Sequence, residues 1–368
     1  MKRAEAERDA AYMRLAMAEA IRALGRTHPN PAVGAIVVSK GQIVGRGWTK
    51  PPGGPHAEIV ALKAAGKKAK GATLYTTLEP CNHYGRTPPC SDAILKAGIK
   101  RVVYGSLDPN PKVNGAGLRK LRRGGVAVKG PVLRQETEAL NRPFFKLHRS
   151  GLPWVTLKAA ITLDGKLATS EGDSRWVSSG EARTMAHELR DRVDAIMVGA
   201  GTVKTDDPRL TTRLSPKGRD PARVVLDARL STSPRSQIYR QRSEAPTIIA
   251  TAKSAASAAA RRYAPAQVWK IARDPKAKGQ VDLRAVLERL ADEGMLHLLV
   301  EGGAELHSSF LKSGLWDELL LFVAPKLAGH EGLTWSGRLG VSEMSKAITL
   351  GALTVEPVGP DLLLHVLR

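Results

Sequence analysis

Four residues between positions 56 and 90 are of the types that a zinc-activated hydrolysis requires. His56 and Glu58 are separated by one residue, Cys81 follows a Leu-Glu-Pro segment, and Cys90 comes nine positions later. A catalytic zinc site takes three protein ligands, commonly His nitrogen and Cys sulfur, and leaves its fourth position to water. We predict that His56, Cys81 and Cys90 bind Zn²⁺. Glu58, which is not a ligand, would then transfer protons from the metal-bound water to a leaving amine.

The spacing of this group constrains both the substrate pocket and the local fold. Zinc-dependent nucleobase deaminases carry a His-x-Glu segment and two cysteines two residues apart, whereas eight residues, 82–89, separate the cysteines here. A longer loop of this kind would line a more specialised pocket. Side chains two apart on a helix do not face each other, so His56 and Glu58 can converge only at a helix start. We therefore predict helices that begin near His56 and near Cys90, direct their N-termini at the metal and lower the pKa of a thiol there.

Two other interpretations of the same residues remain open from the sequence: a structural zinc site, or a pair of buried cysteines. A structural site is closed by a fourth protein ligand, which His28 or His83 could supply. Neither interpretation gives Glu58 a role, so hydrolytic deamination is the favoured chemistry.

Length favours a two-domain protein, and the charge indicates either an anionic partner or only a highly soluble surface. A chain of 368 residues exceeds the usual size of a single core, so two domains are expected. The net charge is +22, from 57 basic and 35 acidic residues, and attracts anions. Nucleic acid is disfavoured because the basic residues are scattered and aromatic residues make up only 4%. A phosphorylated small molecule fits the charge equally well.

Cysteine usage and hydropathy favour a cytoplasmic protein without a membrane segment. Both cysteines lie in the predicted zinc group, so no disulfide framework is expected and a reducing compartment is favoured. Residues 1–8 alternate charges and lack the apolar segment of a signal peptide. The longest apolar runs, such as 319–325, are far too short to span a bilayer.

Apolar periodicity and turn residues predict an α/β chain with two domains, 1–149 and 150–368. The first should be a sheet with helices on both faces, with helices at 5–24, 56–65, 90–97, 115–123 and 132–147, and strands at 33–39, 42–48, 73–77, 101–105 and 126–128. The pattern restarts at 150–153. In the second domain we expect strands at 154–161, 195–198, 223–226, 247–250 and 296–300, and helices at 180–190, 282–293 and 304–313. Residues 252–264 are alanine-rich, a bias that the good helix propensity of alanine explains.

Two glycine clusters follow predicted strands in the second domain. The first, Gly199-Ala200-Gly201, is not a dinucleotide-binding fingerprint, because Lys204 occupies the place of its third glycine. The second, Gly302-Gly303, precedes a predicted helix, and backbone N–H groups at such a helix start bind phosphate. A simple tight turn is an equally good interpretation of the second cluster.

Longer motifs in both halves point to one enzyme family. The first half contains the segment Thr76–Cys90 described above, flanked by Pro29-Asn30-Pro31 and Asp108-Pro109-Asn110-Pro111. The second half contains Thr156-Leu157-Lys158, Leu163-Asp164-Gly165, Gly201-Thr202-Val203, Asp206 to Thr211, and Val300-Glu301-Gly302-Gly303. Over essentially its whole length the chain resembles the bifunctional riboflavin-biosynthesis deaminase/reductases.

The resemblance implies a cytidine-deaminase-like N-terminal domain and a dihydrofolate-reductase-like C-terminal domain. The first would use Zn²⁺ to hydrolyse the 2-amino group of a diamino-pyrimidinone ribosylamine 5′-phosphate. The second would use NADPH to reduce the ribosyl group to ribityl. A homo-oligomer, dimer or tetramer, is the expected assembly, with no nucleic-acid or membrane partner.

The same resemblance implies contact residues, matched position by position. For the deaminase pocket they are Asn30, His83, Arg86 and Asn110. For the reductase cofactor they are Ala160, Trp176, Thr202, Asp206, Gly303, Ala304, Glu305, Leu306, His307, Ser308 and Ser309. For the reductase substrate they are Lys158, Ser174, Arg190, Leu210, Arg213 and Glu301. The arginines would bind the substrate phosphate, and the lysine would lie near the reacting ribose.

Two positions depart from the family, and several expectations keep an alternative. Thr49 stands where many members have histidine. Arg86 stands where lysine is frequent, so a planar guanidinium with several hydrogen-bond donors replaces a single ammonium group.

Asn30 and Asn110 could be turn formers beside proline, and Trp176 could be a core residue. The rival functions are a zinc deaminase of another nucleobase, for example in tRNA, with an unrelated C-terminal domain, and a basic nucleic-acid-binding protein with structural zinc.

Overall fold

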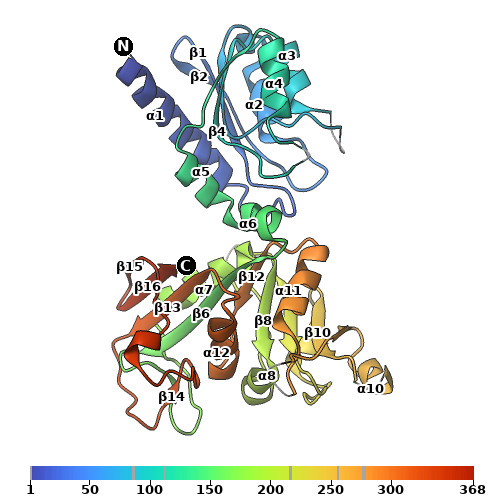
Figure 1. Ribbon diagram of the computed structural model, residues 1–368, viewed down its shortest axis with the longest axis vertical. Helices are drawn as coiled ribbons and strands as arrows, with labels where there is room; N and C mark the ends of the chain where they lie inside the picture. The colour runs from blue at the N-terminus through green and yellow to red at the C-terminus, as the bar shows by residue number, and fades with distance from the viewer. Residues whose placement is uncertain (1, 85–87, 112, 215–217, 255–256, 276–278) are drawn as a thin grey trace. The chain divides into compact units, whose positions relative to one another are not determined.

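The computed structural model describes residues 2–84, 88–111, 113–214, 218–254, 257–275 and 279–368 (Figure 1). The chain forms two compact units, Met1–Gly151 and Leu152–Arg368. Their main sheets have five and nine strands, each covered by helices, which confirms the expected α/β fold class. Within the described ranges, no helix combines the length and the apolar character needed to cross a membrane.

The first unit is built on a mixed sheet of order β2-β1-β3-β4-β5. Its strands are β1 Gly34–Ser39, β2 Gln42–Trp48, β3 Thr73–Leu78, β4 Arg101–Ser106 and β5 Ala127–Lys129. β1 runs antiparallel to β2 and β3, whereas β3, β4 and β5 are parallel. The helices are α1 Lys2–Ile21, α2 Ala57–Ala65, α3 Cys90–Lys96, α4 Ala116–Arg123, α5 Arg134–Leu140 and α6 Arg142–Ser150, with a 3₁₀ turn at Gly66–Ala69. The elements predicted up to residue 128 are confirmed, with small shifts at their ends.

Two glycines in β2 let α2 approach the sheet closely. A Cβ at Gly45 would lie 2.2 Å from the Ala61 carbonyl oxygen, and one at Gly47 would lie 2.3 Å from the Ala57 carbonyl oxygen. No side chain fits into such a space, so the backbone of α2 lies directly on β2. α1 covers the other face of the sheet. His56, immediately before α2, is therefore held in a fixed position relative to the sheet.

The single helix predicted over 132–147 is wrong, because the chain turns at Asn141 and forms α5 and α6 instead. Asn141 has the non-helical φ and ψ values −123° and 28°. Its Oδ1 accepts a 2.7 Å hydrogen bond from the Ala32 N–H, and its Nδ2 donates a 2.9 Å bond to the Ala32 carbonyl. This pair of bonds fixes the loop that leads from Asn30 into β1.

A buried aspartate ties α1 to the sheet. Asp9 accepts hydrogen bonds from Arg101 at 2.7 and 2.9 Å and from the Tyr75 hydroxyl at 2.9 Å. Lys129 Nζ lies 2.8 Å from the same carboxylate. Burial alone would raise the pKa of Asp9, but the donors of Arg101, Lys129 and Tyr75 lower it to about 2. The ionised form of Asp9 therefore stabilises the folded unit.

Replacing Asp9 with asparagine is expected to lower the free energy of unfolding of the first unit by about 2 kcal/mol at neutral pH. The folded-state pKa lies below the ordinary value of 3.8, so this contribution is present above pH 3.8 and is lost as the pH falls toward 2. Urea unfolding of both proteins at neutral pH and at about pH 3 should show a difference that shrinks at the lower pH. The control is Glu7→Gln, an exposed carboxylate on the same helix, which should change stability by less than about 0.5 kcal/mol. An equal difference at both pH values would contradict this account.

The second unit is built on a nine-stranded sheet of order β11-β10-β9-β8-β12-β6-β13-β16-β15. Its strands are β6 Trp154–Thr162, β8 Ala195–Gly199, β9 Ala222–Leu226, β10 Thr247–Ala252, β11 Gln267–Ile271, β12 His297–Val300, β13 Glu318–Ala324, β15 Leu353–Val358 and β16 Asp361–Leu367. Its helices are α7 Gly180–Arg192, α8 Ala200–Asp206, α9 Gln237–Arg240, α10 Ser257–Arg261, α11 Leu283–Asp292 and α12 Ala304–Ser313, with a 3₁₀ turn at Met344–Lys346. A separate small pair joins β7 Lys166–Ala168 and β14 Leu333–Thr334.

The strands from β11 to β13 in this sheet are parallel, and β16 and β15 add an antiparallel edge. Apolar side chains cover both faces, for example Met197 on one and Ile196 on the other. Burial on both faces is typical of parallel strands. Because parallel strands end at the same edge, the carboxyl ends of β6, β12, β8 and β9 lie next to one another. Ligands of open α/β sheets bind at such an edge.

The elements predicted for the second unit are confirmed, with small shifts at their ends. The alanine-rich stretch 252–264 is helical only in part. Ala252 belongs to β10, and only Ser257–Arg261 is helical among the described residues of this range. The high helix propensity of alanine is overridden because Ala252 is buried in the sheet. Strands β11, β13, β15 and β16 were not predicted.

Candidate functional site

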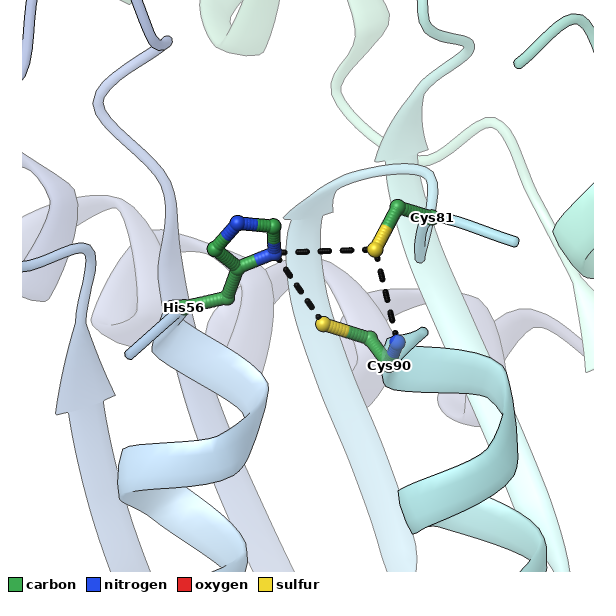
Figure 2. Close-up of side chains that lie close together, drawn as sticks. All are labelled: His56, Cys81 and Cys90. Carbon is green, nitrogen blue, oxygen red and sulfur yellow. Dashed lines mark hydrogen bonds between the residues drawn. The ribbon is translucent and has the colours of Figure 1, made fainter. Parts of the chain in front are cut away.

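Three side chains from separate segments meet in the first unit (Figure 2). His56 precedes α2, Cys81 lies in the loop after β3, and Cys90 is the first residue of α3. His56 Nδ1 lies 3.2 Å from the Cys90 sulfur and 3.6 Å from the Cys81 sulfur, and all three ligand atoms lie within 4.8 Å of one another. Tetrahedral Zn²⁺ with ordinary bond lengths places such atoms roughly 3.5 Å apart. The donor set and its spacing therefore fit zinc.

Within the described part of the chain, this group consists of three possible ligands. Among the residues that the structure describes, no other His, Cys, Asp or Glu, including His28 and His83, joins these three. A structural zinc site would be closed by a fourth protein ligand. The arrangement therefore favours a catalytic site with one position left for water.

Both predicted helix starts are confirmed at this group. His56 caps α2 with extended φ and ψ values of −69° and 161°, and Cys90 opens α3. The Cys90 N–H donates a 3.3 Å hydrogen bond to the Cys81 sulfur. The Cys90 thiol, followed by the His56 ring, lowers the pKa of Cys81 to about 4, while contact with Cys81 raises the pKa of Cys90. The thiol whose pKa is lowered is therefore that of Cys81. It lies in the loop before α3 and accepts the hydrogen bond from the first N–H of that helix.

Glu58 lies beside the three ligands without belonging to them. It occupies the first turn of α2, and only 4% of it is exposed. Burial raises the pKa of the Glu58 carboxyl to about 7, although the charge of His56 opposes the shift. A carboxyl group that titrates near neutrality can both accept and donate a proton, which general acid–base catalysis requires.

The residues expected around the pyrimidine lie on loops near the strand ends. Asn30 is exposed in the loop before β1, His83 is exposed in the loop after Cys81, and Asn110 is half-buried in the loop after β4. Arg86 lies outside the described residues. Thr49 is buried, and its hydroxyl accepts a 3.1 Å hydrogen bond from the N–H of residue 33, so it has a structural place in this chain. The substrate contacts expected of the other four stay predictions.

A cavity of about 860 Å³ lies at the carboxyl ends of the parallel strands in the second unit. It extends from Ala160 of β6, past Glu301 after β12 and Gly199 at the end of β8, to Ala228 after β9. A Cβ at Gly199 or Gly303, which cap α8 and α12, would meet nothing within 4 Å, so a ligand can approach the backbone closely. The expected reductase residues that line this cavity are Ala160, Ser174, Trp176, Thr202, Asp206, Glu301, Gly303, Ala304, Glu305, Leu306 and Ser309.

Three expected contact residues direct their side chains elsewhere. His307 is buried, with Nδ1 3.2 Å from the Trp335 carbonyl, and the Ser308 hydroxyl accepts a 2.6 Å hydrogen bond from the Gly337 N–H. Both hold α12 to the segment that follows β14. Leu210 packs into the core under the sheet. None of these three residues is part of the described cavity wall. Their contacts with a cofactor or substrate therefore stay predictions without support from the cavity.

Trp176 is not a core residue. It is 64% exposed and forms part of the cavity wall, so the alternative of a purely structural role is wrong. The Arg183 guanidinium lies 4.5 Å from the centre of its ring. An exposed aromatic ring at a cavity can stack on a planar ligand.

A buried glutamate pairs with two cations beside the cavity. Arg190 of α7 donates to both Glu301 oxygens at 2.9 and 2.8 Å, and Lys158 Nζ lies 3.9 Å from Glu301. Burial would raise the pKa of Glu301, but Arg190 and Lys158 lower it to about 2. Arg213 donates a 3.3 Å hydrogen bond from Nε to the ring of His187, next to this pair. Because cations outnumber carboxylates in the cluster, it favours an anionic substrate.

One part of the cavity wall was not predicted from the sequence. It consists of Leu226, Ala228, Gly279, Gln280 and Val281. Leu226 and Ala228 lie at the carboxyl end of β9, next to β8 in the parallel sheet, so the strand order is a signal that could have found them. Residues 279–281 lie eight or more positions beyond the end of β11, and no local motif marks them.

Comparison with known proteins identifies both units. Residues 6–106 match the zinc-binding region of cytidine and deoxycytidylate deaminases, and residues 153–364 match the RibD C-terminal domain. The chain belongs to the RibD family. Like the RibD proteins, it is a riboflavin-biosynthesis enzyme with a zinc-binding deaminase domain and a reductase domain.

RibD proteins of several bacteria match along the whole chain. The riboflavin biosynthesis protein RibD of Aquifex aeolicus is 46% identical over 98% of this chain and 99% of its own, and that of Escherichia coli is 37% identical over 97% and 99%. A solved Thermotoga maritima structure, described as a diaminohydroxyphosphoribosylaminopyrimidine deaminase/5-amino-6-(5-phosphoribosylamino)uracil reductase, is 36% identical, with a TM-score of 0.87 over 99% of both chains. The RibD match of the second unit excludes the alternative of a tRNA deaminase with an unrelated C-terminal domain.

Proposed function

We propose that the first unit hydrolyses the 2-amino group of 2,5-diamino-6-ribosylamino-4(3H)-pyrimidinone 5′-phosphate. The second unit then reduces the ribosyl side chain of the product to ribityl with NADPH. The observation that carries the first step is the open three-ligand group with Glu58 buried beside it. The description of the Thermotoga maritima relative supports the substrate and both reactions.

In the deamination, His56, Cys81 and Cys90 would hold Zn²⁺, which supplies a bound water of lowered pKa. Glu58 takes a proton from the attacking water and passes it to the leaving amine. The second proton of the water goes to the neighbouring ring nitrogen, so the amino-substituted C=N unit and water become a ring N–H, a ring carbonyl and ammonia. The pyrimidine is held by Asn30, His83, Arg86 and Asn110.

In the reduction, NADPH bound in this cavity would supply a hydride for C1′ of the opened ribose, and a proton would complete the ribityl chain. The residues that would hold the cofactor along the cavity are Ala160, Trp176, Thr202, Asp206 and, at the start of α12, 303–306 and Ser309. The substrate lies beside the charged cluster, whose excess positive charge receives its phosphate. The proposed substrate residues are Lys158, Ser174, Arg190, Arg213 and Glu301.

The full chain can be tested with the diamino-pyrimidinone phosphate and NADPH, following ammonia release and NADPH oxidation together. Ammonia should appear first, and NADPH oxidation should follow it. Removal of zinc by a chelator should stop ammonia release and leave NADPH oxidation on pre-deaminated substrate unchanged, because the metal group lies in the first unit. Ammonia release at the normal rate from zinc-free protein would overturn the proposed deamination.

The proposed assembly is a homo-oligomer, a dimer or a tetramer. β15 is the outermost strand at one edge of the nine-stranded sheet, and its Leu353 and Val355 are exposed. An uncovered apolar edge strand favours association with another chain. Light scattering should give a mass at least twice 39.5 kDa, and a monomer at micromolar concentration would contradict the proposal.

The proposed location is the cytoplasm. Cys81 and Cys90 are free thiols, which a reducing compartment preserves. The anionic partner in this proposal is the phosphorylated substrate, so neither nucleic acid nor a membrane is required to account for the charge of +22.

A further inference from the structure

The cavity of the second unit has two ends with different chemistry. One end adjoins the charged cluster of Lys158, Arg190 and Glu301. The other end is formed by Leu226, the last residue of β9, by Ala228 after it and by residues 279–281. Under the proposed function the nicotinamide must lie at the first end, next to the reacting ribose. The adenosine half of the cofactor then extends toward the end of β9.

The residue that would favour NADH at this place is not available. In dinucleotide sites a carboxylate near the end of a strand binds the 2′-hydroxyl of NAD, whereas an arginine accommodates the 2′-phosphate of NADP. Asp227 follows β9 directly, but it is only 2% exposed and does not line the cavity. One of its oxygens accepts the N–H and hydroxyl of Ser231 at 2.9 and 3.1 Å, and the other accepts those of Thr232 at 2.8 and 2.9 Å. Asp227 therefore holds the turn together and cannot also bind a ribose hydroxyl.

Among the described residues that follow β9, Arg229 is a charged side chain beside this end of the cavity. It is exposed, and it follows Ala228, which lines the cavity. A Cβ at Gly279 would lie 2.9 Å from Arg229 Nη2, so the guanidinium lies against another residue of the cavity wall. Over the described ranges of the chain, no carboxylate pairs with this guanidinium. Its donors are therefore open to an anion.

We propose that Arg229 binds the 2′-phosphate of the cofactor and so makes the reductase select NADPH over NADH. The inference rests on the proposed function, because it requires a nicotinamide cofactor in this cavity. A guanidinium presents a planar fork of donors that matches a phosphate group. NADH carries a hydroxyl at the same position and gives Arg229 no anionic partner.

The test compares NADPH and NADH binding to the full chain by tryptophan fluorescence. The wild type should bind NADPH at least about 10-fold more tightly than NADH. Arg229→Gln should weaken NADPH binding by about 10- to 100-fold and leave NADH binding within about 2-fold, because only NADPH loses a charged partner. Arg229→Lys should retain part of the preference. The matched control is Arg240→Gln, an exposed arginine outside the cavity wall, which should keep the wild-type ratio.

Two results would overturn the inference. One is an Arg229→Gln variant with an unchanged ratio of NADPH to NADH affinity, and the other is an equal loss of affinity for both nucleotides. A wild type that binds neither nucleotide at millimolar concentration would instead overturn the proposed reductase function. The two failures are therefore distinguishable in one titration series.

Discussion

Glu58→Gln is expected to slow ammonia release by about 10²- to 10⁴-fold. Glutamine keeps the shape of the side chain, but it can neither take a proton from the attacking water nor deliver one to the leaving amine. Because Glu58 is buried, bulk water has little access to replace it. The measurement is the initial rate of ammonia release by the purified full chain, together with the zinc content of each protein.

The other properties of this variant separate the proton-transfer role from a structural one. Zinc per chain should stay unchanged, because Glu58 is not among the three ligands. NADPH oxidation on pre-deaminated substrate should continue at the wild-type rate. Glu7→Gln, an exposed glutamate of α1, is the matched control and should release ammonia normally. Ammonia release at the wild-type rate by Glu58→Gln would show that another group carries the proton.

Glu301→Gln is expected to destabilise the second unit by about 3–5 kcal/mol and to abolish NADPH oxidation. Glutamine is neutral, so Arg190 and Lys158 would remain largely buried without the carboxylate that now lies 2.8 and 3.9 Å from them. An uncompensated charge in such a site costs far more than a lost surface pair. Urea unfolding and calorimetry of the full chain should show a shifted transition for the second unit. The transition of the first unit should not move.

Two further variants test whether the stranded charge is the cause. Glu293→Gln breaks an exposed pair with Arg289 on α11 and should cost less than about 0.5 kcal/mol. Adding Arg190→Met to Glu301→Gln removes one of the two stranded cations and should restore part of the lost stability. A double variant no more stable than Glu301→Gln would show that the lost stability has another origin.

The metal group could be predicted from the sequence because its chemistry is carried by few residues. Cys81 and Cys90 are the only cysteines of the chain. His56 and Glu58 are two residues apart, so their side chains can converge on one metal only if a helix begins there. The spacing of these four residues along the chain was therefore sufficient to predict most of the geometry of the metal group. The open fourth position did not follow from the sequence, because it depends on where every other possible ligand lies in the fold.

The reductase cluster could not be predicted from local spacing, since its members meet only through the order of the strands. Arg190 and Glu301 are 111 residues apart. They come together because β8, β12 and β6 are neighbours in the sheet. The break at Asn141 has the same origin, because its partner Ala32 is 109 residues away. A periodic apolar pattern contains no information about such partners.

The bonds between Asn141 and Ala32 also define where the chain could be cut to obtain a free-standing deaminase. The deaminase family match ends at residue 106, after the last metal ligand and Glu58. A truncation there would keep the metal group but remove the brace on the loop that carries Asn30. The shortest fragment expected to keep the whole pocket wall extends through α5 to the end of α6 at Ser150.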